Sequence, residues 1–125
     1  MQTINIKDLP GEIFPSGRHT RVFVGPQSPI QADNFVSGYV IIEPGGAVPS
    51  HEHEQEEVYY VLKGRGEMTV GAETQTMQAV SAVYIPSNTR HTLRNSGDGE
   101  LHMLFVYSPA GVVSHWQEER EGHLK

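Results

Sequence analysis

The sequence predicts an all-β domain, built as a barrel or as two packed sheets, and three observations carry this prediction. Thirteen glycines and eight prolines recur at short intervals and separate brief runs of β-forming residues. No stretch before Ser108 keeps a helical period long enough to compete. The runs VYYVL (58–62) and LFVY (104–107) are apolar at odd and even positions alike, which indicates strands buried on both faces. One face would pack against a partner sheet, and the other would lie inside a barrel or in a dimer contact.

Eight strands are expected in order along the chain, each bounded by a segment that favours turns. Their ranges are 20–24, 35–42, 57–63, 66–70, 73–77, 82–85, 91–95 and 101–107. The breaks PGGAVP, KGRG, VGAE, IPSNTR and NSGDGE are rich in residues that suit turns. The tail GVVSHWQEEREGHLK is expected to form a short helix that packs Trp116 on the barrel, or an extended strap. We expect one domain over 1–125, with a core at about 20–107, an N-terminal arm at 1–19 and a C-terminal tail at 108–125.

Length and composition limit the class of protein. A chain of 125 residues buries roughly two thirds of its unfolded surface, which is enough for one core. No apolar run approaches the ~18 residues of a membrane span, and the N-terminus does not read as a signal peptide, so we expect a cytoplasmic protein with no membrane partner. The net charge of −6, with nine Lys and Arg scattered among fifteen acids, argues against nucleic-acid binding. Without cysteine there is no disulfide framework and no thiolate metal site, whereas seven histidines stand out.

The segment HEHEQEE (51–57) places two histidines and several carboxylates directly before a predicted buried strand. Side chains alternate faces along an extended chain, so His51, His53 and Glu57 project to one side and the glutamates at even positions to the other. One interpretation is a solvated acidic loop, because charge-rich segments usually face water. The other is a metal site, because an ionised carboxylate inside a β-core is costly unless a cation neutralises it.

His91, which begins a later strand after the proline-marked turn IPSNTR, supplies a fourth donor. Neutral imidazole and carboxylate ligands together suit Zn, Ni, Fe, Mn or Cu. Three histidines and one carboxylate leave one or two positions open on a five- or six-coordinate ion. That is the arrangement of a catalytic metal rather than of a closed structural one.

Two motifs in this part of the chain resemble those of the cupin superfamily. The first, G-x5-H-x-H-x3-E-x6-G, is matched in full by Gly45, His51, His53, Glu57 and Gly64.

The second motif, G-x5-P-x-G-x2-H-x3-N, is matched at Pro86, His91 and Asn95, while Val80 and Asn88 replace its two glycines. Asparagine tolerates a positive φ better than other non-glycine residues, so we expect the turn at Asn88 to be kept.

The resemblance covers residues 45–95 by motif and about 20–107 by strand pattern. It implies a double-stranded β-helix, or jelly roll, of the small single-domain type, which is commonly a homodimer. It also implies one divalent metal ion (Fe, Mn, Ni or Zn), with four ligands: His51, His53, Glu57 and His91.

Further residues are candidates for the wall of the site. Tyr59 shares the parity of Glu57, so its hydroxyl could act as a hydrogen-bond donor or a base beside the metal. The alternative is a core aromatic residue whose hydroxyl reaches solvent. Arg18 and Arg21 precede the first long strand, where a guanidinium suits a substrate carboxylate; the alternative is a surface or dimer-interface role.

Tyr39 and His102 lie on strands expected to flank the barrel, and they are further candidates for substrate contact, although parity does not fix which way they face. Three methionines, Met68, Met77 and Met103, are expected to fill the core. His115 and Trp116 are expected to anchor the tail rather than to act in chemistry.

Since a fold does not determine a function, three hypotheses stay open. The leading one is a metal-dependent enzyme acting on a small oxygenated substrate (a carbonyl compound, a hydroxy acid or a sugar): a dioxygenase with Fe, or an isomerase, lyase or decarboxylase with Zn, Ni or Mn. The alternative is a non-catalytic domain that binds or senses a sugar, a carboxylate or a hormone-like ligand. The third, a structural protein with a vestigial site, is disfavoured by the intact set of four ligands.

Overall fold

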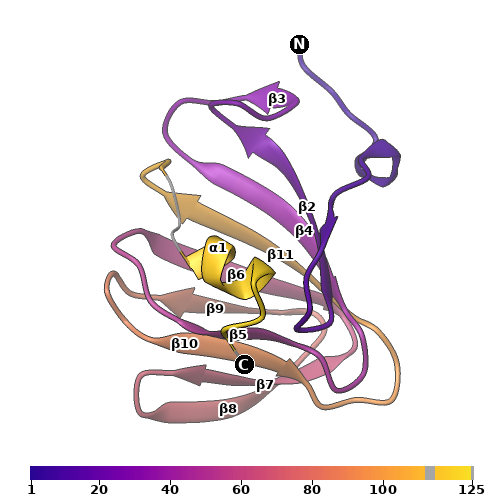
Figure 1. Cartoon of the computed structure of the whole chain (residues 1–125), viewed down its shortest axis with the longest axis vertical. Coiled ribbons are helices and arrows are strands. Elements are labelled where there is room, and N and C mark those ends of the chain that lie inside the picture. The colour runs from indigo at the N-terminus through magenta and orange to yellow at the C-terminus, as the bar shows by residue number, and fades with distance from the viewer. Residues whose placement is uncertain (112–114, 125) are drawn as a thin grey trace.

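The strands form two sheets that face each other in a jelly roll (Figure 1), in a computed structural model that describes residues 1–111 and 115–124. The seven-stranded sheet has the order β1-β2-β4-β11-β6-β9, with β3 paired to β2, and the four-stranded sheet has the order β5-β10-β7-β8. The elements are η1 (Ile6–Asp8), β1 (Glu12–Ile13), β2 (Arg18–Gly25), β3 (Ile30–Gln31), β4 (Val36–Ile42), β5 (Ala47–His51), β6 (Glu56–Lys63), β7 (Arg65–Val70), β8 (Glu73–Gln78), β9 (Ser81–Ile85), β10 (His91–Asn95), β11 (Leu101–Ser108) and α1 (His115–Arg120).

All eight predicted strands are present, with ends that differ from the prediction by two residues or fewer. The sequence reading missed β5 and the two-residue strands β1 and β3. The start of β5 lies within the predicted break PGGAVP, where glycine and proline outweigh the β-forming residues beside them. β5 matters here, since it ends on His51.

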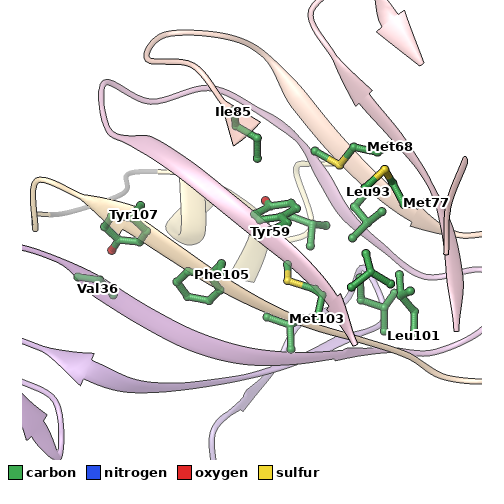
Figure 2. Close-up of a cluster of buried hydrophobic side chains, with 14 residues drawn as sticks. Val36, Tyr59, Met68, Met77, Ile85, Leu93, Leu101, Met103, Phe105 and Tyr107 are labelled. Carbon is green, nitrogen blue, oxygen red and sulfur yellow. The ribbon is translucent and has the colours of Figure 1, made fainter. Parts of the chain in front are cut away.

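The core lies between the two sheets and consists of inward-facing side chains from both (Figure 2). Along β11 buried and half-buried residues alternate, as expected for a strand with one face on the core. The three methionines Met68, Met77 and Met103 belong to this core, as predicted. Burial on both faces is not seen in β6, where the outward residues Tyr60 and Leu62 are each 41% exposed.

The C-terminal tail contains the short helix α1, which resolves the alternative between helix and strap; residues 112–114 and 125 of that tail lie outside the described part. The indole of Trp116 makes edge contacts with the rings of Phe14 and Phe105, at centroid distances of 6.2 and 6.4 Å. None of the helices in the described residues is long and apolar enough to span a membrane.

The turn before β10 depends on Asn88, which takes a φ of 56° in the left-handed region. This is the conformation predicted for the residue that replaces a glycine of the second motif. The Asn88 backbone N–H donates to the carbonyl of His53 at 2.8 Å. The turn therefore ties the loop that carries His53 to the strand that begins with His91.

Candidate metal centre

Four candidate ligands converge between the two sheets. His51 ends β5 and His91 begins β10, and the two face each other directly in the register of that strand pair. Glu57 comes from β6 in the other sheet, and His53 lies in the loop between β5 and β6. One nitrogen or oxygen atom from each residue lies within 4.8 Å of the others. The predicted convergence is therefore present, but it arises from a crossover between sheets and not from parity along one extended strand.

Backbone carbonyls orient all three imidazoles. The Nδ1 atoms of His51, His53 and His91 lie 2.6, 3.0 and 2.8 Å from the carbonyl oxygens of their neighbours two residues away, those of Pro49, Gln55 and Thr89. A carbonyl oxygen only accepts, so each Nδ1 carries the proton and each Nε2 is left with a lone pair. Such outer contacts are typical of histidines that bind metals.

Glu57 supplies the negative charge of the cluster. Its Oε1 lies 3.1 Å from Nε2 of His53 and 3.3 Å from Nε2 of His91, and the carboxylate is only 5% exposed. Burial lowers the pKa of His53, but its hydrogen bond to Glu57 and the charge of that carboxylate outweigh burial and raise the pKa overall. Burial, together with the neighbouring His115 and His91, lowers the pKa of His51.

These observations fit a divalent cation. Three imidazole lone pairs and one buried carboxylate meet at one point. With the proton of His53 on Nδ1, its Nε2 lone pair faces the carboxylate oxygen of Glu57 at 3.1 Å, and a cation among these atoms would balance the charge. Three Nε2 atoms and one carboxylate oxygen form a ligand set suited to Zn, Fe, Mn or Ni. The glutamates at even positions, 52, 54 and 56, are exposed as predicted.

A small cavity lies beside the cluster, with a volume of about 20 Å³. Its walls include Arg18, His51, His53, Glu57, Tyr59 and His115. Tyr59 is buried and its ring lies 5.9 Å from that of His91. Burial and the charge of Glu57 raise the pKa of Tyr59 well above its ordinary value, so its hydroxyl keeps its proton and is suited to donate rather than to act as a base.

His115, on α1, lies directly on the cluster instead of only anchoring the tail. Its ring stacks on that of His51, with centroids 3.6 Å apart and planes 18° apart. Neither ring nitrogen has a hydrogen-bond partner among the described residues. Burial and the nearby Arg18 lower the pKa of His115 to about 2, so its imidazole is neutral. The helix α1 therefore closes one side of the cavity.

The predicted substrate contacts separate into two groups. Arg18 lines the cavity, but its guanidinium is paired with Glu119 of α1. Arg21, Tyr39 and His102 line a groove on the outer face of the seven-stranded sheet, beside residues 3–7 of the N-terminal arm. The Tyr39 hydroxyl is 2.6 Å from Nδ1 of His102. None of these three reaches the cavity, because alternation along their strands turns them away from it.

Sequence reasoning missed two residues beside the cavity: Glu119, which accepts from the cavity residue Arg18, and Ser16, whose hydroxyl donates to the same carboxylate at 2.6 Å. It also gave His115 a different role. His115 and Glu119 are spaced by four, so they share one face of a helix, and this spacing was a usable signal. The pairing of Glu119 with Arg18, 101 positions away, leaves no trace in local sequence.

A family model described as "Cupin domain" matches residues 38–107, which contain all four candidate ligands. The chain is 40% identical over 102 residues to "Polyketide synthase CurC" from Streptomyces cyaneus, an alignment that covers 78% of this chain and 66% of that protein. It is 36% identical over 123 residues to "Auxin-binding protein 1" from Arabidopsis thaliana, covering 83% of this chain and 57% of that protein. The chain thus spans about two thirds of the length of the first relative and 57% of the length of the second.

Among solved structures, the polyketide cyclase RemF from Streptomyces resistomycificus superposes with a TM-score of 0.75 at 22% identity, over 100% of this chain and 99% of that one. At this identity the likeness shows the shared fold alone. Other similar proteins include oxidases, lyases and dioxygenases.

Proposed function

This chain belongs to the cupin family, and we propose that it is a metal-dependent enzyme acting on a small oxygenated substrate through an enolate-like anion. The observation that carries the proposal is the convergence of three lone-pair nitrogens and one buried carboxylate at the wall of a small cavity. A bound metal would supply a Lewis acid that polarises a substrate carbonyl. The rest of the chemistry belongs to the residues around it.

Each residue of the cavity has a physical role in this proposal. The cluster would hold the ion and leave positions open for substrate oxygens. The Tyr59 hydroxyl, which keeps its proton, is a donor for a substrate oxygen on which charge develops. The apolar walls, among them Met103 and Phe105, exclude water and strengthen these interactions.

Two of the similar proteins support non-redox chemistry on a carbonyl-rich substrate. One relative carries the name of a polyketide synthase component, and a structural neighbour is described as a polyketide cyclase. Ring closure of a chain of ketones proceeds through proton removal beside a carbonyl, which is the step that a Lewis acid assists. We extend this reaction class, and no particular substrate, to the present chain.

The experiment measures exchange of the acidic C–H protons of acetylacetone in D2O by NMR, with protein loaded in turn with Zn, Ni, Mn or Fe(II). We expect exchange faster than with free metal, abolished by EDTA and by His53→Ala. Fe(II)-dependent oxygen consumption without such exchange would instead identify a dioxygenase. Absence of both reactions in metal-loaded protein would contradict an enzymatic role.

The second candidate is a binding protein for a small carboxylate or hormone-like ligand, which the identity of 36% to an auxin-binding protein favours. Saturable ligand binding in metal-loaded protein, with no product after long incubation, is the result expected of it.

A further inference from the structure

Arg18 holds a carboxylate in a preorganised cradle. Its Nε and Nη2 atoms donate to Oε2 and Oε1 of Glu119 at 2.7 and 2.6 Å, the two-pronged geometry in which guanidinium binds carboxylates most strongly. The Ser16 hydroxyl donates to the same Oε2 at 2.6 Å. The pair is buried, with side-chain exposures of 3% for Arg18 and 0% for Glu119.

The cradle is fixed by contacts that do not involve Glu119. The remaining terminal nitrogen of Arg18, Nη1, donates to Thr20 Oγ1 at 2.6 Å, and the guanidinium lies 4.0 Å from the centre of the Phe14 ring. Arg18 and Thr20 both belong to β2, which is paired with β1 and β4 in the seven-stranded sheet. The two N–H groups and the Ser16 hydroxyl would therefore keep their positions if Glu119 left.

The cradle and the metal cluster share one cavity, which is too small for an organic ligand. Arg18, His51 and Glu57 all line it, and its volume of about 20 Å³ holds about one water molecule. Ligand pockets usually measure a few hundred Å³. The side closed by His115 and Trp116 belongs to α1, a helix of only six residues that is too short to be stable without such contacts.

We propose that Arg18 and Ser16 form a carboxylate-binding subsite, which Glu119 occupies in the closed chain and which the carboxylate of a small-molecule ligand takes over when α1 is displaced. One carboxylate replaces another, so the buried guanidinium never stays unpaired during the exchange. The subsite deepens the proposed function, and the identity of its ligand rests on that function. The ligand would be a substrate with a carboxylate at one end and a metal-binding oxygen at the other.

The test uses metal-free protein treated with EDTA and the variant Glu119→Gln, whose amide presents N–H donors where the guanidinium needs an acceptor. Thermal unfolding is followed in sodium acetate and in sodium chloride of equal ionic strength. We expect the variant to unfold at a lower temperature than wild type in chloride. Acetate should raise its midpoint in a saturable way, by about 10 °C at a hundredfold excess over the dissociation constant.

Two controls isolate the cradle. Glu12→Gln removes the carboxylate of the exposed Arg120–Glu12 ion pair and should show no acetate effect beyond that of wild type. The double variant Arg18→Met/Glu119→Gln removes the cradle itself and should lose the acetate effect. If Glu119→Gln does not fold in chloride, the readout becomes recovery of the β-sheet circular dichroism on refolding in acetate.

An equal response of Glu119→Gln to acetate and chloride, or no recovery in acetate, would overturn the proposal and leave Arg18–Glu119 as a structural ion pair. Because no metal is present in these measurements, that result would not touch the proposed metal chemistry. Conversely, an acetate effect in a chain that binds no metal would support the subsite and contradict the proposed function.

Discussion

Replacement of Glu57 by Gln is the most informative single change at the cluster, because it keeps the shape of the side chain and removes its charge. Glu57 is the carboxylate of the set, and its Oε1 lies 3.1 and 3.3 Å from two of the three Nε2 atoms. Since the ligand atoms lie within 4.8 Å of one another, an ion held among them would lie no farther than about 4 Å from this oxygen, the separation used for the estimate below.

At that separation two unit charges interact by about 4 kcal/mol at an effective dielectric constant near 20. The attraction between a divalent ion and the carboxylate is larger than this, but the amide oxygen of Gln retains part of it. We therefore take about 4 kcal/mol as the loss in the free energy of metal binding. The dissociation constant of the metal should then rise about a thousandfold. Competition with a chelator of known affinity measures it.

The matched control is Glu56→Gln, which removes the same charge one residue earlier. The Glu56 carboxylate is exposed and accepts from the Tyr84 hydroxyl, so its loss should change metal affinity by less than about twofold. In metal-free protein, NMR titration should also show a lower pKa for His53 in Glu57→Gln than in wild type, since Glu57 is what raises it against burial. A Glu57→Gln protein that binds metal within about threefold of wild type would refute the reasoning.

Three further predictions concern the ligands, the pH and the core. His53→Ala should lose the metal and remain folded by circular dichroism, since His53 lies in a loop; unfolding would instead make the ion a structural element. Metal affinity should fall about tenfold per pH unit as the pH drops, because a proton on His53 excludes the metal. The fall should start above pH 6.5, since Glu57 outweighs burial and raises the pKa of His53. A dissociation constant unchanged from pH 8 to pH 5 would count against the site. Gly38→Ala should cost about 1–3 kcal/mol in the free energy of unfolding, because an added Cβ would overlap the Phe105 ring. Gly99→Ala is the matched control: nothing lies within 4 Å of its added Cβ, so a urea titration should find it near neutral.

Local sequence predicted the strands well because alternation and turn residues are themselves local. The eight strand ranges and the left-handed turn at Asn88 follow from such signals. Local sequence did not predict the strand β5, because its first residues lie in a glycine- and proline-rich stretch. Its pairing with β10 is a contact between distant segments, which local signals do not reveal.

The candidate site shows the same division. The four ligands were visible as two motifs, but the crossover that brings His51 and Glu57 from different sheets was not. Arg18 was assigned to a carboxylate by its chemistry, whereas its partner in this structure, Glu119, lies 101 positions away. The outward placement of Arg21, Tyr39 and His102 depends on strand register that parity alone does not fix.

The central claim is that His51, His53, Glu57 and His91 hold one divalent metal ion, and metal analysis of freshly purified protein tests it most directly. Wild type is expected to contain about one ion of Fe, Mn, Ni or Zn per chain. A His51→Ala/His91→Ala variant that keeps its β-sheet circular dichroism is expected to contain none. Wild-type protein that is purified without metal and then takes up none of these ions at neutral pH would contradict the claim.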